Sequence, residues 1–353
     1  MIARRTLLGG VLAAGGLSLV PRRALAGPTL SAATYTAERG GISFLVMRAG
    51  EVVFENYPNG GAPDRPHELA SGAKSFTGVM AAAAVQDQLM VLDEPAADTL
   101  PEWRNDPVKR LITIRQILSL TSGLDTRQTR GNLLTYAEGI GMPVVATPGE
   151  RFAYGGDPFQ LFGAVLHRKL RERETPAEYL KRRVLDPAGV FVGSWRNGPD
   201  GLPRLGSGAR LTAREWAKYG DLVRRDCMVD QRALVDSRAL AAHFQGSAPN
   251  PAYGLGWWLN RPMPDDKRAA IPQLANATDV HPDDRNLPSD LFFAAGAGQQ
   301  RLYVSKTERL VVVRQADNIR AALRRRGIWK AERGPRWSDR AFWAALRKDA
   351  ALG

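Results

Sequence analysis

The sequence of 353 residues contains a single cysteine, Cys227. One cysteine cannot form an intramolecular disulfide, so the burial of apolar side chains must hold the fold together. Apolar residues make up 44% of the chain, and its 35 glycines and 23 prolines are scattered. This composition is typical of a folded protein with a sizeable core, either in two domains or in one large domain with an insertion.

Histidine is also scarce, with four residues at positions 67, 167, 243 and 281. They lie far apart, and none of the short spacings that mark a zinc site occurs. The segment His281-Pro282-Asp283-Asp284 is more typical of a polar loop than of a cation site. We therefore expect neither a metal nor an organic cofactor.

The apolar stretch from Leu7 to Val20 is too short and too rich in glycine to span a bilayer. It follows the twin arginines Arg4 and Arg5 and precedes Ala24-Leu25-Ala26, a small-x-small site. This pattern predicts a twin-arginine export signal over residues 1–26, cut after Ala26, and a periplasmic or secreted location. The alternative is a cytoplasmic protein with a basic, apolar N-terminus.

The net charge of +13 is unevenly distributed. Residues 301–353 hold 14 Lys and Arg against 5 Asp and Glu, whereas residues 27–300 are balanced. In the basic segment Ser338 precedes Phe342, Trp343 and Leu346 at helical spacing, which favours a terminal helix packed on a sheet over a surface for anionic lipid. No nucleic-acid motif accompanies the charge, so we expect no nucleic-acid partner and no stable membrane span.

The pattern of apolar residues predicts a mostly antiparallel sheet flanked by helices, an α/β fold of the α+β type. Strand-type residues form a hairpin around Arg48-Ala49-Gly50 and return near the C-terminus, while helical periods dominate between them. We expect residues 27–90 and 196–353 to form a discontinuous sheet-containing domain and residues 91–195 an inserted helical domain. The expected strands are 41–57, 253–260, 290–305 and 309–316, and the expected helices begin at 71, 113, 157, 175 and 338.

Ser71 lies three residues before Lys74, at the start of the predicted helix. One helical turn brings the hydroxyl and the amine to the same face, and the helix N-terminus offers free backbone N–H groups. Small and apolar neighbours would bury Lys74, and burial lowers the pKa of a lysine so that it can accept a proton. The spacing therefore indicates a nucleophile with its base, but a serine at a helix start is also a common N-cap.

Two further segments favour catalysis. Tyr154 follows a Pro-Gly turn and precedes a predicted helix, so its phenol can enter a cleft. A predicted strand ends in Gly296-Ala297-Gly298, where small residues would let a substrate lie along the strand beside a free main-chain N–H.

This order of motifs resembles the serine β-lactamase and penicillin-binding-protein-like superfamily, in particular its class C-like branch of esterases, amidases and D-alanyl-D-alanine peptidases. Further segments resemble that branch: Thr121-Ser122-Gly123-Leu124, the G-S-G-A-R-L-T sequence at 206–212, and the Y-G-x-G-W sequence at 253–257. The resemblance implies that Ser71 is acylated, that Lys74 is its general base, and that Tyr154 carries the proton to the leaving group. It also implies an oxyanion hole made by the backbone N–H groups of Ser71 and Ala297.

The sequence departs from that branch at two of its three motifs. Gly156 replaces the asparagine of the Tyr-x-Asn motif, and Ala294-Ala295-Gly296 replaces a Lys/His-Ser/Thr-Gly motif. These changes remove groups that would hold a side-chain amide and a carboxylate, which favours uncharged esters or amides. The predicted substrate-contacting residues are Gly156, Ala295, Gly296 and Trp257.

The sequence thus predicts an exported, monomeric serine hydrolase that acts on a small-molecule ester or amide. One alternative is a D-alanyl-D-alanine carboxypeptidase or weak β-lactamase, acting on cell-wall peptide or lactam. Another is a catalytically degenerate penicillin-binding fold that serves as a binding module.

Overall fold

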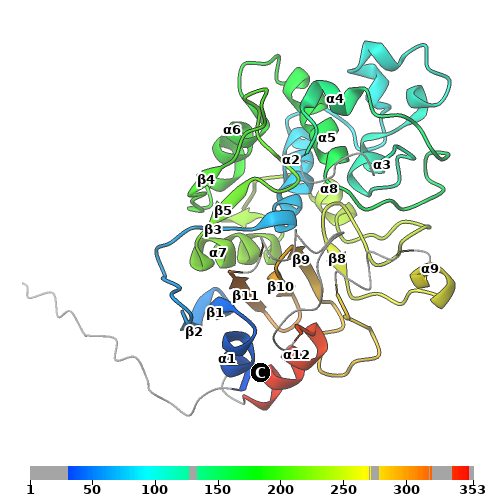
Figure 1. Ribbon diagram of the computed structural model, residues 1–353. Helices are drawn as coiled ribbons and strands as arrows, with labels where there is room; N and C mark the ends of the chain where they lie inside the picture. Colours follow the sequence, from blue (N-terminus) through cyan, green and yellow to red (C-terminus); the bar gives the residue numbers. More distant parts are fainter. Residues whose placement is uncertain are drawn as a thin grey trace, which may run out of the picture.

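A computed structural model describes residues 31–126, 133–269, 271, 278–317, 319 and 336–349. Within these residues the largest sheet has six antiparallel strands in the order β2-β1-β11-β10-β9-β8 (Figure 1). This confirms the predicted fold class. The strands are β1 (Gly41–Arg48), β2 (Glu51–Asn56), β8 (Trp258–Leu259), β9 (Phe292–Gly296), β10 (Gln300–Ser305) and β11 (Leu310–Ala316).

The hairpin predicted near residue 50 is present as β1 and β2. Ala49 and Gly50 both have positive φ, at 55° and 92°, as a tight two-residue hairpin turn requires. Strand β1 then pairs on its other side with β11, with Leu45 opposite Val313. Every residue of β11 is buried, so this strand lies at the centre of the core.

Helices cover both faces of the sheet. On one face α7 (Ala213–Arg224) packs against β1, β10 and β11, and on the other α1 (Ser31–Glu38) packs against β1 and against α12 (Asp339–Lys348) (Figure 1). The C-terminal helix begins as predicted, because the Ser338 side chain accepts a hydrogen bond from the Ala341 N–H. Its apolar face is buried and its last turn is basic.

The central helix α2 (Ser75–Gln86) has residues 75–84 entirely buried. Alanine and glycine make this possible, because small side chains let neighbouring elements approach from all sides. Helix α8 (Ser237–Ala242) packs against it on one side and α6 (Pro176–Leu180) on another.

The helices predicted between residues 91 and 195 are present, and the domain boundaries stay a prediction. The regular elements there are η2 (Ala96–Asp98), η3 (Pro101–Trp103), η4 (Lys109–Leu111), α3 (Ile114–Leu118), α4 (Tyr136–Ile140), α5 (Asp157–Lys169), α6 and a π-helical turn (Lys181–Leu185). Thr175 caps α6 as predicted, since its side chain accepts from the Glu178 N–H. The remaining short elements are β3 (His67–Glu68), β4 (Ser194–Trp195), β5 (Ala209–Leu211), β6 (Met228–Val229), β7 (Arg232–Ala233) and α9 (Asp265–Ala269).

Two predicted elements are shorter than expected. Helix α3 ends at Leu118 rather than Gly123, because Leu120 has a φ of 62° and the Ser119 and Thr121 hydroxyls hydrogen-bond each other at 2.9 Å. Such local side-chain bonds compete with helix continuation. Strand β8 has two residues rather than eight, and helix α1 was not predicted.

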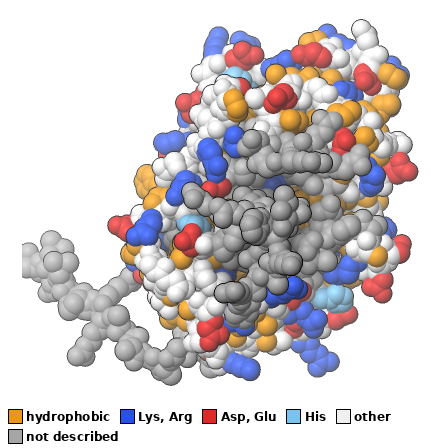
Figure 2. Space-filling model, in the orientation of Figure 1, with side chains coloured by type: hydrophobic (Ala, Val, Ile, Leu, Met, Phe, Trp, Pro, Cys, Tyr) orange, Lys and Arg blue, Asp and Glu red, His pale blue; other side chains and the backbone are white. Residues whose placement is uncertain are grey.

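Charges are interspersed on the described surface. On the face shown in Figure 2, acidic and basic side chains alternate over the same regions, in keeping with the balanced composition of residues 27–300. Among the described residues, no helix has both the length and the hydropathy to cross a membrane. The predicted export signal and most of the basic segment after residue 319 lie outside the described residues.

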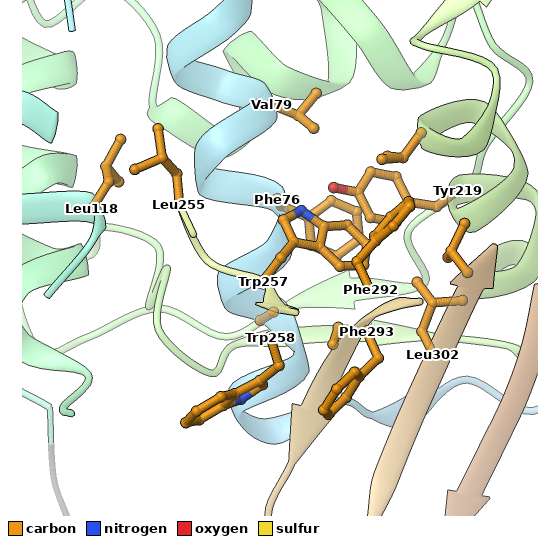
Figure 3. Packing of buried hydrophobic residues seen from close by; sticks show 14 of the residues in the cluster. Phe76, Val79, Leu118, Tyr219, Leu255, Trp257, Trp258, Phe292, Phe293 and Leu302 are labelled. Atoms are coloured by element: carbon orange, nitrogen blue, oxygen red, sulfur yellow. The ribbon is translucent and has the colours of Figure 1, made fainter. Parts of the chain in front are cut away.

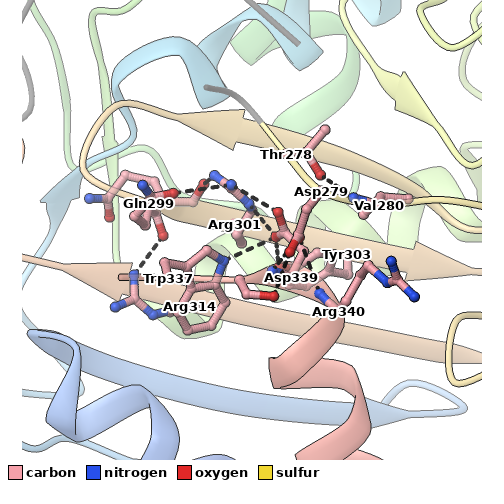
Figure 4. Close-up of polar contacts among 12 residues, drawn as sticks. Thr278, Asp279, Val280, Gln299, Arg301, Tyr303, Arg314, Trp337, Asp339 and Arg340 are labelled. Atoms are coloured by element: carbon pink, nitrogen blue, oxygen red, sulfur yellow. Dashed lines mark hydrogen bonds and ion pairs between the residues drawn. The ribbon is translucent and has the colours of Figure 1, made fainter. Parts of the chain in front are cut away.

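A buried ion pair joins α12 to the sheet (Figure 4). The Arg301 guanidinium donates to the Asp339 carboxylate at 2.8 Å, and both side chains are 2% exposed. Tyr303 and Trp337 also donate to Asp339. Burial alone would raise the pKa of Asp339, but Arg301 and these hydrogen bonds outweigh it and hold the pKa below its usual range.

We expect Asp339→Asn to lower the free energy of unfolding by about 3–5 kcal/mol at neutral pH, because it removes the negative charge that balances a buried guanidinium. Since the folded pKa is depressed, the carboxylate stabilises the fold above about pH 4 and loses that effect as the pH falls further. The difference between the two proteins should therefore shrink in acid, as measured by urea unfolding at several pH values. Asp186→Asn, in the exposed pair with Lys181, is the matched control and should cost about 1 kcal/mol or less; equal losses in both variants would contradict this role of Asp339.

Candidate active site

Ser71 lies in the short 3₁₀ turn η1 (Ala70–Lys74) that leads directly into α2. The residue before it, Ala70, has a φ of 47°, in the left-handed region that a non-glycine residue rarely adopts. Leu69 occupies the N-cap position of the turn, so Ser71 is not an N-cap. The N-cap interpretation of Ser71 is therefore wrong, and its partly exposed side chain instead contacts Lys74.

Lys74 is buried beside Ser71. The residue is 3% exposed. Its Nζ donates to Ser71 Oγ at 2.9 Å and to the Gly206 carbonyl at 3.0 Å. The aromatic rings of Tyr154 and Phe159 lie 5.1 and 5.5 Å from Nζ. The predicted contact between the serine hydroxyl and the lysine amine is therefore present in the structure.

The backbone of Lys74 is fixed by a close neighbour. A Cβ on Gly256 would lie 2.3 Å from the Lys74 carbonyl oxygen, and Gly256 has a φ of 87°. Both the conformation and the contact require glycine at this position. Gly256, the second glycine of the Y-G-x-G-W segment, thus holds the lysine turn in place.

Tyr154 enters the same site from the segment before α5. Its ring stacks on Trp258 with centroids 5.5 Å apart and an angle of 27°, and it meets Tyr253 edge-on at 6.1 Å. Phe152 completes this aromatic cluster at 6.4 Å. The cluster fixes the ring of Tyr154 over the Lys74 amine.

Strand β9 ends next to Ser71. A Cβ on Gly296 would lie 2.1 Å from the Leu69 carbonyl oxygen, so the strand approaches the serine turn as closely as a glycine allows. Ala297 follows and is partly exposed, whereas Ala294 and Ala295 are buried, at 1% and 7% exposed. Gly296 is therefore packed on the serine turn, while Ala295 has little surface to offer a substrate. The oxyanion role of Ala297 stays a prediction.

The buried side chain of Gln300 shapes the turn that follows. Its Nε2 donates to the carbonyls of Gly298 at 3.2 Å and Ala316 at 2.8 Å, and its Oε1 accepts from the Ala316 N–H at 2.9 Å. The turn at Gly298 and Gln299 has positive φ at both residues. Gln300 thus fixes the orientation of the peptides next to Ala297.

Of the two adjacent tryptophans, Trp258 rather than Trp257 reaches the site. Trp257 is fully buried and packs against Tyr219 and Phe292 in the core (Figure 3). Trp257 therefore offers no surface to a substrate, and it is Trp258 that stacks on the ring of Tyr154. Neighbouring strand residues point to opposite faces, but here both faces are buried, so the sequence could not distinguish them.

Gly156 stands where an asparagine would be expected, and its surroundings are already filled. A Cβ there would lie 2.2 Å from a methyl carbon of Leu133, and Gly156 also touches Gly206. Sequence reasoning gave no role to Gly206, Gln300 or Leu133. Of these three, only Gly206 lies in a recognisable motif, the G-S-G-A-R-L-T segment, which could have indicated its place in the site.

Other reactive groups lie elsewhere. Burial raises the pKa of the Cys227 thiol to about 12, so this cysteine stays protonated and unreactive at neutral pH. His243 is fully buried against α2, and burial lowers its pKa. In the described part of the chain, no three histidine, cysteine, aspartate or glutamate side chains are grouped to hold a metal ion.

Residues 29–318 match the family model described as Beta-lactamase. The chain belongs to the beta-lactamase family. This match covers most of the sequence, and it confirms both the resemblance and the prediction of an enzyme of this class of hydrolases.

Individual relatives of the beta-lactamase family are distant. Protein flp of Staphylococcus aureus (strain NCTC 8325 / PS 47) is 26% identical over 168 residues, which cover 42% of this chain and 33% of that protein. The chain thus spans about a third of the length of the curated relatives it matches.

Two solved structures share the fold. EstCE1, described as a hydrolase with promiscuous acyltransferase activity, has a TM-score of 0.60 at 17% identity and covers 81% of this chain and 92% of its own. A D-stereospecific amidohydrolase from Streptomyces sp. has a TM-score of 0.59 at 15% identity, with coverages of 82% and 94%.

We expect Gly296→Ala to slow the reaction of Ser71 with a fluorophosphonate probe by about 10²-fold, because the added methyl must displace strand β9 or the serine turn by roughly 1 Å. The rate of covalent labelling and the far-UV circular dichroism spectrum would be measured together. Gly141→Ala, where the nearest atom to a Cβ is 3.3 Å away, is the control. An unchanged labelling rate in Gly296→Ala would contradict the importance of this close approach.

Proposed function

We propose that this protein is a serine hydrolase that forms an acyl-enzyme at Ser71 and acts on an ester or amide. The observation that carries the proposal is the 2.9 Å contact between Ser71 Oγ and the buried Nζ of Lys74. A serine hydroxyl becomes an effective nucleophile when an adjacent base accepts its proton. The proposed steps use side chains, backbone N–H groups and water alone.

In the proposed mechanism the neutral amine of Lys74 accepts the Ser71 proton while it donates to the Gly206 carbonyl. Ser71 Oγ forms a bond to the carbonyl carbon of the substrate, and the bond to the leaving group breaks as Tyr154 donates its phenolic proton to that group. Lys74 then passes the proton taken from Ser71 to the phenolate. The backbone N–H groups of Ser71 and Ala297 stabilise the oxyanion. A water molecule, deprotonated by Lys74 and Tyr154, then hydrolyses the acyl-enzyme, and Ser71 recovers its proton.

The surroundings of Ser71 support an uncharged ester or amide. Ala294 and Ala295 provide neither a cation nor a hydroxyl for a carboxylate, and Gly156 provides no side-chain amide. The structurally similar EstCE1 is described as a hydrolase with promiscuous acyltransferase activity, and the Streptomyces protein as a D-stereospecific amidohydrolase. We therefore favour ester or amide hydrolysis over the cell-wall peptidase, β-lactamase and non-catalytic alternatives.

We further propose that the enzyme acts as a monomer outside the cytoplasm. The residues assigned to the steps above come from one chain, and residues 1–26 carry the pattern of a twin-arginine signal. Replacing Arg4 and Arg5 with lysine should leave the protein in the cytoplasmic fraction of the cells. Undiminished export of this variant would contradict the signal.

We expect the mature protein to be labelled by a fluorophosphonate probe and to hydrolyse chromogenic esters, and Ser71→Ala to lose both, because it lacks the nucleophile. A fluorescent penicillin in the same assay tests the alternatives. Penicillin labelling with slow release would favour a cell-wall peptidase or weak β-lactamase. Absence of any labelling at Ser71 would leave only the binding module.

We expect Lys74→Ala to lower kcat by about 10³–10⁶-fold, as loss of one member of a catalytic unit does elsewhere. Lys109→Ala removes another lysine that lies over an aromatic ring, that of Trp103, and should leave kcat unchanged. Thermal unfolding of each variant separates loss of the base from loss of the fold. Turnover close to that of the wild type would exclude Lys74 as the base.

A further inference from the structure

The two glycines that follow Tyr154 are covered by the side chains of Thr126 and Leu133. A Cβ on Gly155 would lie 2.6 Å from the Cβ of Thr126, and a Cβ on Gly156 would lie 2.2 Å from a δ-carbon of Leu133. Both distances are far below van der Waals contact. Thr126 and Leu133 therefore pack directly on the backbone of the Tyr154–Gly156 segment.

The backbone conformation does not explain the glycine at position 156. Its φ and ψ are −96° and −26°, in the right-handed helical region that any residue adopts. An asparagine at this position would be acceptable to the main chain. An asparagine side chain there would instead overlap a δ-carbon of Leu133, which would have to move aside.

Leu133 also lies close to Gly206, the residue that binds Lys74. A Cβ on Gly206 would be 3.3 Å from the other δ-carbon of Leu133 and 2.9 Å from the Gly156 carbonyl oxygen. Gly206 is the residue whose carbonyl accepts from Lys74 Nζ at 3.0 Å. Leu133 is only partly buried, so this aliphatic side chain keeps some surface beside Gly156 and Gly206.

We propose that Leu133 is a specificity-determining residue, which fills the place of the missing asparagine with an apolar wall beside Lys74. This inference rests on the proposed function. An acyl group with an alkyl chain can pack on a leucine without losing any hydrogen bond. An acylamino group would leave its N–H and C=O without hydrogen-bond partners there. Buried polar groups without partners are costly, so the site should select simple alkyl esters over N-acylamino esters.

The test compares wild type, Gly156→Asn, Leu133→Ala and the double variant. Gly156→Asn alone should lower the Tm by about 2–8 °C, because the new side chain overlaps Leu133. Leu133→Ala should remove most of that penalty, so the two changes should not be additive. Leu111→Ala, at a leucine that is 60% exposed, is the control and should not rescue Gly156→Asn.

The specificity is read with two p-nitrophenyl esters, the butyrate and the N-acetyl-D-alanine ester, which share one leaving group. Wild type should favour the butyrate by at least about 10-fold in kcat/KM, and the double variant should narrow this ratio by about 10-fold. Additive Tm losses would overturn the packing argument, and an unchanged ratio would overturn the role of Leu133 in selectivity. If Ser71 is labelled in every variant, either failure concerns Leu133 alone; if it is labelled in none, the proposed function fails first.

Discussion

The buried amine of Lys74 is the constraint on which the site depends. A lysine that is 3% exposed must have its polar hydrogens satisfied by the protein, since water cannot reach them. Ser71 Oγ and the Gly206 carbonyl meet this need, and the rings of Tyr154 and Phe159 enclose the amine. The two acceptors come from parts of the chain 135 residues apart, so the lysine can be satisfied only when the whole fold is complete.

Much of the fold could be predicted because it is encoded locally. Alternating β-type residues around Ala49-Gly50 give the hairpin, small apolar residues after Ser75 give the central helix, and Ser338 marks the start of the last one. The order of Ser71, Lys74, Tyr154 and Gly296 was also readable, because motif spacing survives where overall identity does not. Ser71 and Lys74 are in contact, the Tyr154 ring lies near the amine and Gly296 packs on the serine turn, while their catalytic roles stay a prediction.

What could not be predicted depends on contacts between distant segments. No local pattern tells that Leu133 fills the space at Gly156, or that Gln300 turns its amide toward Ala316. The sequence pointed to Trp257 rather than Trp258 for a related reason. Alternation along a strand identifies the exposed face only where one face of the sheet meets water. Helix α3 was overestimated because hydroxyl contacts between Ser119 and Thr121 outweigh its helical period.

The pairing of β1 with β11 has a consequence for how the chain folds. Leu45 and Val313 are neighbours in the sheet although 268 residues separate them in sequence, and the Asp349 carboxylate accepts from the N–H groups of Ser31 and Ala32. Contacts of such long sequence separation are slow to form. During synthesis the β1 edge of the first hairpin therefore stays unpaired until residue 316 has been made. A chain truncated before β11 lacks the strand that joins this hairpin to β10.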